Sequence, residues 1–175
     1  MSEGLWLTVL TMNQLLQQCA DFLTENEWHF ECAPDPCRLN TSFEGEHARW
    51  QVVVVCDEDG DSLKFVSKFP SKVKRALIPK ASELVLRINN QIKFGSLHLD
   101  LDDGDIFFVT ELFAADKSAD TEDIKHLIAS NLCILDGHYD TLMKVIHGGM
   151  SPKRALALAE GKKAEPKHQS RFSMN

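Results

Sequence analysis

Three motifs that mark common kinds of function are missing from this sequence of 175 residues. It has no Cys-x-x-Cys pair, no glycine-rich phosphate loop and no Gly-x-Ser-x-Gly turn. Closely spaced cysteines usually supply structural zinc sites, and the two glycine motifs support phosphate binding and ester hydrolysis. We therefore expect a protein that is not an enzyme and that uses neither a cofactor nor a metal ion.

Long apolar runs are also missing. The longest uncharged one, Leu5 to Leu10, is far shorter than the roughly 20 residues that cross a bilayer. Glu3 precedes it in place of basic residues, and no small-residue cleavage site follows, so no secretory signal is expected. Five cysteines, an odd number without paired spacing, are typical of reduced thiols. We expect a cytoplasmic protein that does not bind a membrane.

Basic residues are scarce in most of the chain. The formal charge is -7, but residues 1–149 carry a net -11 and residues 150–175 a net +4. An acidic body repels phosphate backbones, so we expect no nucleic acid partner. We interpret residues 1–10 as an N-terminal extension, 11–160 as one domain and 161–175 as a disordered basic tail.

Four segments show the apolar spacing of a helix. The expected helices run over residues 12–26, from Pro79 to Gly95, from Thr121 to His147, and from Ser151 to Glu160. Thr11 and Gln14 form a capping box at the start of the first helix. Gly137 could bend or interrupt the third.

Other segments alternate between apolar and polar residues or are rich in valine, as strands are. They cover residues 28–33, 39–43, 50–56, 63–69, 97–101 and 106–113. A two-residue turn at Asp103-Gly104 would pair Leu101 with Ile106 and Leu99 with Phe108. The predicted fold class is α+β: one antiparallel sheet of about five to six strands packed with helices, in the order α-β-β-β(-β)-α-β-β-α-α.

Alternation also assigns residues to the two faces of this sheet. The predicted core face carries Trp50, Val52, Val54, Leu97, Leu99, Leu101, Ile106 and Phe108. The opposite face then carries Phe107, Val109, Val53 and Val55, which are too many apolar residues for open water. Either the helix from Thr121 covers them, or another protein does. These four are therefore the candidate partner-binding residues, with a second copy of the chain as one possible partner.

Several stretches resemble the YbjN-type family, whose members are described as regulators of bacterial sensory transduction. They are Arg87-Ile88-Asn89-Asn90, Phe94 to Asp100, Asp103-Gly104 with Ile106 to Val109, Trp50 to Val54, and Val145 to Ala155. The resemblance covers about residues 12–158. It implies a fold similar to that of type III secretion chaperones and a binding or regulatory role. The family is not defined by catalytic residues, so it assigns no role to any single residue.

Two clusters of residues are similar to metal-binding motifs but do not match them. Asp100, Asp102, Asp103 and Asp105 resemble a calcium loop, but Gly104 is one place early and the flanking residues alternate like strands. Cys32 and Cys37, with His29 and His47 nearby, lack the paired spacing of a zinc site.

We therefore expect a non-enzymatic cytoplasmic protein-binding regulator or chaperone-like adaptor. The alternative is a small-molecule sensor or an enzyme that uses Cys and His in a pocket.

Overall fold

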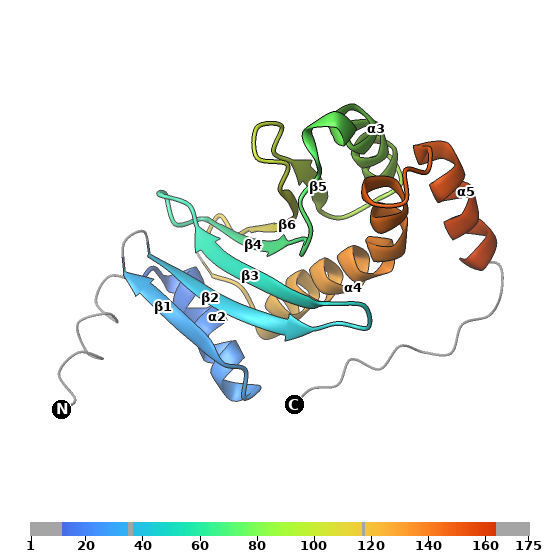
Figure 1. Cartoon of the computed structure of the whole chain (residues 1–175). Helices are drawn as coiled ribbons and strands as arrows, with labels where there is room; N and C mark the ends of the chain where they lie inside the picture. The colour runs from blue at the N-terminus through green and yellow to red at the C-terminus, as the bar shows by residue number, and fades with distance from the viewer. Residues whose placement is uncertain (1–11, 35–36, 117, 164–175) are drawn as a thin grey trace.

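The computed structural model describes residues 12–34, 37–116 and 118–163, and its elements follow the predicted order (Figure 1). They are α2 (Gln14–Glu25), β1 (Phe30–Pro34), β2 (Cys37–Glu44), β3 (Arg49–Cys56), β4 (Ser62–Lys68), the 3-10 turn η1 (Arg75–Leu77), α3 (Ile78–Asn89), β5 (Ser96–Leu99), β6 (Ile106–Phe113), α4 (Thr121–Ile146) and α5 (Pro152–Lys163).

The strands form one antiparallel sheet of six strands in the order β1-β2-β3-β4-β6-β5. β1 to β4 follow one another as a meander. The β5–β6 hairpin then joins through β6, because β6 pairs with β4. The predicted α+β class and its single antiparallel sheet are confirmed.

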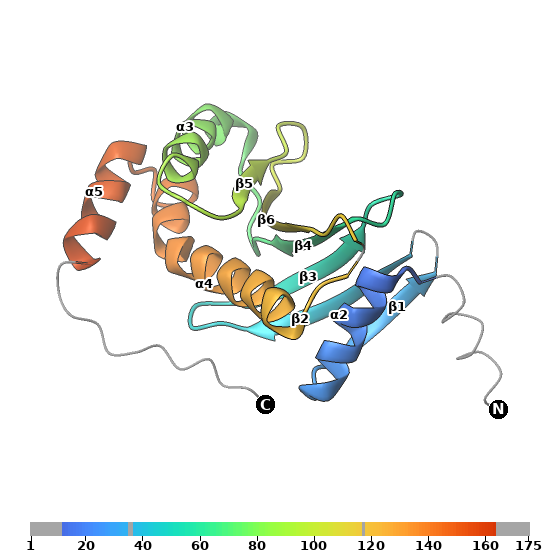
Figure 2. The ribbon, with the colours of Figure 1, turned by 180° about the vertical axis from the view of Figure 1, so that it is seen from behind.

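One face of the sheet is covered by helices. Seen from behind, α4 crosses in front of the strands and α2 lies over β1 and β2 (Figure 2). α4 packs against β4 and β6 through Leu127, Ile128 and Asn131, all of which are buried. Of the predicted core residues, Trp50, Val52, Val54, Leu97, Ile106 and Phe108 are at most 3% exposed.

The predicted hairpin register is wrong by two residues. Leu99 pairs with Ile106 and Leu97 with Phe108, so residues 100–105 form a longer turn. The Asp100 carboxylate stabilises this turn, since it accepts hydrogen bonds from the main-chain N–H groups of Asp102 and Asp103. A shift of two residues keeps each side chain on its face. The shift places Leu101 in the turn, where its side chain is 63% exposed, and Leu99 is only half-buried. Neither residue is therefore enclosed in the core as predicted.

The helices also differ from the prediction in detail. α3 ends at Asn89, before the expected end at Gly95. The cap of α2 is Asn13, whose Oδ1 accepts a hydrogen bond from the Leu16 N–H at 2.9 Å. Thr11 of the predicted capping box lies outside the described residues. α4 continues through Gly137 without interruption, and α5 runs to Lys163, past the expected end at Glu160. The extension 1–10 and residues 164–175 of the predicted tail also lie outside the described residues.

Candidate protein-binding face

The second face of the sheet carries no packed helix among the residues that the structure describes. We call it the open face, and it is the face turned to the viewer in Figure 1. α4 packs on the opposite side, where Asn131 and Leu127 bond to groups of β4 and β6. The alternative that the helix from Thr121 covers the second face is therefore wrong.

A row of valines crosses the centre of the open face. Val53 in β3 pairs with Val66 in β4, and Val66 pairs with Val109 in β6. All three are half-buried. Cross-strand neighbours on one face lie in contact, so the three side chains form one continuous apolar row. The sequence analysis missed Val66, although the alternation of β4 places it opposite Val53.

The two remaining candidate residues flank this row and are also half-buried. Phe107 pairs with Lys68, whose ammonium nitrogen lies 5.7 Å from the centre of the phenyl ring. Val55 lies on the other side, opposite Lys64. The structure thus places Phe107, Val109, Val53 and Val55 on one face, as the alternation predicted.

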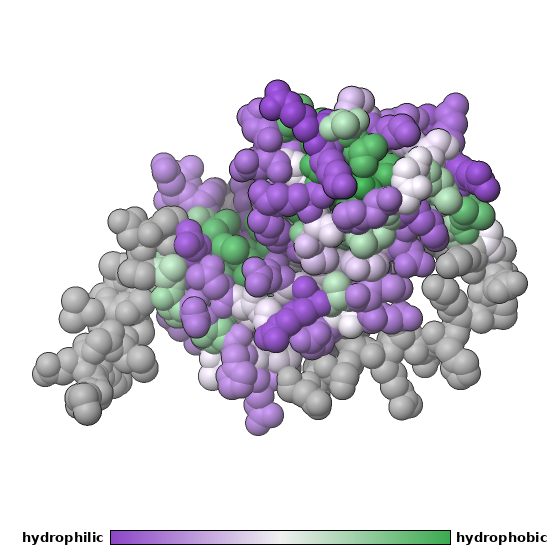
Figure 3. All heavy atoms as spheres, viewed as in Figure 1, coloured by the Kyte–Doolittle hydropathy of each residue, from purple (hydrophilic) through white to green (hydrophobic). Residues whose placement is uncertain are grey.

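A groove of about 650 Å³ is hollowed into this face and spans five strands. It is lined by His29, Phe30, Glu31, Asn40, Thr41, Ser42, Gln51, Val52, Val53, Val66, Lys68 and Phe107. Its lining combines apolar side chains with hydroxyl, amide and charged ones. The space-filling view shows hydrophilic side chains over most of this face, with a hydrophobic patch near the end of β3 (Figure 3).

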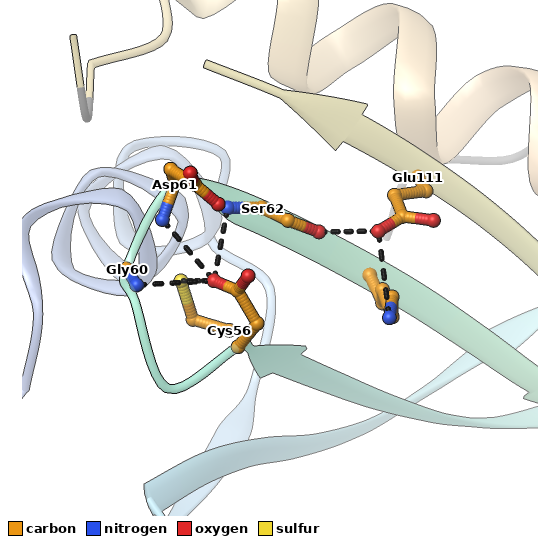
Figure 4. Close-up of polar contacts among 7 residues, drawn as sticks. Cys56, Gly60, Asp61, Ser62 and Glu111 are labelled. Carbon is orange, nitrogen blue, oxygen red and sulfur yellow. Dashed lines mark hydrogen bonds and ion pairs between the residues drawn. The ribbon is translucent and has the colours of Figure 1, made fainter. Parts of the chain in front are cut away.

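Polar contacts order one end of the open face, at the β3–β4 turn (Figure 4). Ser62 donates its hydroxyl to the Glu111 carboxylate, which also pairs with Lys64 at 3.4 Å. Asp57 Oδ1 accepts three main-chain N–H groups of the turn, each at 3.1 Å. Burial alone would raise the pKa of Asp57, but these bonds, that of Ser62 foremost, lower it. The turn therefore keeps a charged, fixed carboxylate at this end.

A second ion cluster lies beyond Phe107. Asp105 accepts from Lys68 at 3.0 Å and from Lys72 at 3.1 Å. Burial alone would raise the pKa of Asp105, but the hydrogen bonds from the two lysines lower it. Three lysines of β4 and the segment after it are thus paired with carboxylates: Lys64, Lys68 and Lys72.

Among the described residues, no cysteine belongs to a group of three or more metal-ligating side chains. All five cysteines are free thiols. Burial raises the pKa of Cys19 to about 12, and burial is also the main cause that raises the pKa values of Cys32, Cys56 and Cys133. A raised pKa leaves little thiolate at neutral pH, and the thiolate is the nucleophile. The groove contains His29 and no cysteine.

In the part of the chain that the structure describes, no helix combines the length and the apolar character that a membrane span requires.

The model of one protein family matches residues 16–143 of the sequence. It is the YbjN family, described as "Putative bacterial sensory transduction regulator". This chain belongs to the YbjN family. The match includes every strand of the sheet and most of α4, so the family's domain contains the whole open face.

The fold is similar to that of a solved structure, "Crystal structure of YbjN, a putative transcription regulator from E. coli". Its TM-score against this structure is 0.57 at 13% sequence identity, over 76% of this chain and 92% of that chain. No curated protein matches the sequence. The resemblance inferred from the sequence is thus confirmed for the family, whose description is that of a regulator.

Proposed function

We propose that this YbjN-family protein is a non-enzymatic regulator that acts by binding another protein through the open face of its sheet. The observation that carries the proposal is the row Val53, Val66 and Val109, which stays half-buried because no described helix packs on it. Apolar side chains at the centre of a face, with ion pairs at both ends, have the layout of an interface core and rim.

The first partner we propose is a second copy of the chain. Homodimers commonly form through a self-complementary patch around a two-fold axis. The open face carries cations and carboxylates near each other, in Lys64 with Glu111 and Lys68 with Asp105. Two copies facing each other can therefore bury the valine row without bringing a surface of one charge against itself.

Light scattering tests this proposal with the double variant Phe107→Asp, Val109→Lys, which adds one charge of each sign to the open face. The matched control is Leu86→Asp, Leu101→Lys, because both leucines are more than 60% exposed and lie outside this face. The wild type and the control should scatter as dimers, and the folded open-face variant as a monomer. A monomeric wild type at high concentration would exclude the dimer. A dimeric open-face variant would exclude this face.

The groove is the observation that supports a second candidate function, that of a small-molecule sensor. Its volume is in the range of ligand pockets, and its lining combines apolar side chains with polar ones that include His29 and Lys68. If a small ligand binds there, Lys68→Met should weaken its binding. Lys74→Met, which removes a lysine outside the lining, should leave the affinity unchanged. Raised cysteine pKa values disfavour the related possibility of thiol catalysis.

We also propose a cytoplasmic location. The five free thiols fit a reducing compartment.

A further inference from the structure

Three metal-ligating side chains meet where the β2–β3 turn contacts α4. They are Glu46 and His47 of the turn and Asp136 of α4, and one ligand atom of each lies within 4.8 Å of the other two. We propose that these residues bind a divalent transition-metal ion. The site lies outside the open face and does not depend on the function proposed above.

Asp136 is held in place by groups other than the proposed metal. Its Oδ1 atom accepts hydrogen bonds from Trp50 Nε1 at 3.0 Å and from the main-chain N–H of His47 at 3.2 Å. The residue is 5% exposed, and no lysine or arginine of the described chain forms an ion pair with it. Oδ2 is thus left for His47, and metal ligands are commonly oriented by such additional hydrogen bonds.

The imidazole of His47 is also fixed. Its Nδ1 atom lies 2.9 Å from Asp136 Oδ2, and the ring stacks on Tyr139 with centres 5.5 Å apart and planes 20° apart. Nitrogen and oxygen ligands sit about 2.1 Å from such an ion, so two ligands at right angles are roughly 3.0 Å apart. The observed separation therefore fits two neighbouring positions of one octahedral ion.

Glu46 completes the set from the solvent side. It is exposed, so the remaining coordination positions of the ion can be filled by water. One imidazole and two carboxylates form a mixed nitrogen and oxygen set, which suits zinc, manganese, cobalt or nickel better than copper(I). Two negative charges beside one neutral imidazole also balance a doubly charged ion.

Gly45 allows the turn to come this close to α4. A Cβ atom at this position would lie 2.3 Å from Asp136 Oδ1 and 2.4 Å from Trp50 Nε1. The local sequence therefore permits the approach that brings His47 to a carboxylate 89 residues away.

Isothermal titration with zinc chloride and, separately, manganese chloride tests the site in the full chain. The ligand variants are His47→Gln and Glu46→Gln. The matched controls are His98→Gln and Glu58→Gln, which remove an exposed histidine and an exposed glutamate elsewhere. The wild type and both controls should bind one ion per chain. Both ligand variants should bind it more than about tenfold more weakly, because even loss of a group that only orients a ligand typically weakens binding by that factor.

Two results would overturn the proposal: no saturable binding of either ion by the wild type, or equal binding by the wild type and Glu46→Gln. Glu46 is exposed, so its substitution should leave the fold intact even where His47→Gln does not. The thermal midpoint gives a second readout, because an ion that binds only the folded chain raises it as the ion concentration increases. That rise should be absent from Glu46→Gln and present in Glu58→Gln.

Discussion

The side-chain amide of Asn131 in α4 donates to the main-chain oxygen of Phe65 in β4 at 2.9 Å, although 66 residues separate them. The same nitrogen lies 3.2 Å from the main-chain oxygen of Phe108, and Asn131 Oδ1 accepts from the Ser67 hydroxyl at 2.5 Å. Asn131 is fully buried. These bonds join α4 to the core face, and the helix is therefore not available to cover the open face.

Replacing Asn131 by Leu should lower the free energy of unfolding by about 2–4 kcal/mol, because Ser67 and Thr110 would lose a buried hydrogen-bond partner. Urea titration measures the loss. Ser130→Ala on the same helix is the control and should change the value by less than about 0.5 kcal/mol. Equal stabilities for the two variants would show that the network does not hold α4.

Two glycine substitutions should change stability in opposite directions. Gly104 has a φ of +73°, and an added Cβ would lie 2.2 Å from the main-chain oxygen of Val73, so Gly104→Ala should destabilise by at least about 1–3 kcal/mol. Gly137 lies within α4 with no atom near its would-be Cβ, so Gly137→Ala should stabilise by roughly 0.5–1 kcal/mol. Thermal unfolding of both variants checks the signs. A stabilising Gly104→Ala would contradict the turn geometry.

The ion cluster at Asp105 predicts a particular dependence of stability on pH. The folded-state pKa of Asp105 lies below its ordinary value of 3.8, because the hydrogen bonds from Lys68 and Lys72 outweigh burial. A carboxyl with a lowered pKa stabilises the fold above its unfolded pKa, and this contribution is lost as the pH falls through the folded pKa.

Asp105→Asn should therefore be less stable than the wild type near neutral pH, and the difference should shrink as the pH falls below 3.8. Urea midpoints measured across the acid range test this. Asp102→Asn, an exposed carboxyl of the same turn, should follow the wild type throughout. If the difference in stability between the wild type and Asp105→Asn instead grew as the pH fell, it would contradict the lowered pKa of Asp105.

The raised cysteine pKa values predict slow alkylation at pH 7. Cys32, Cys56 and Cys133 should react with iodoacetamide more slowly than free glutathione does, and Cys19 should react only when the chain unfolds. Mass spectrometry of labelled peptides gives the rate at each site. If any of these four thiols reacted faster than glutathione, an activated cysteine would be present and thiol catalysis would return as an explanation.

Local patterns were enough to predict most of the fold. The alternation of apolar residues determines which side chains of a strand share a face, so the burial of Val52 and Val54 and the placement of Val53 and Val55 followed directly. The register of the β5–β6 hairpin was predicted wrongly, because it relied on the preference of Asp-Gly for two-residue turns and not on the carboxylate of Asp100. That carboxylate stabilises a longer turn and leaves Leu101 exposed.

Contacts between distant residues could not be predicted in this way. Which face α4 covers depends on the bonds of Asn131, a polar residue within an apolar helix pattern. The approach of His47 to Asp136 depends on a small residue at Gly45 and on an indole donor from Trp50. No spacing rule relates residues 89 positions apart. The candidate metal site was therefore absent from the sequence analysis, whereas the open face was present in it.

Valine methyl NMR over a range of protein concentrations tests most directly whether the open face is a protein-binding surface. Val53, Val66 and Val109 lie on the open face, while Val52 and Val54, the neighbours of Val53 along β3, lie in the core. If two chains associate through this face, the methyl signals of the first three residues should shift with concentration and those of Val52 and Val54 should stay constant. Constant signals at Val53, Val66 and Val109 in a sample that light scattering shows to be dimeric would contradict the account.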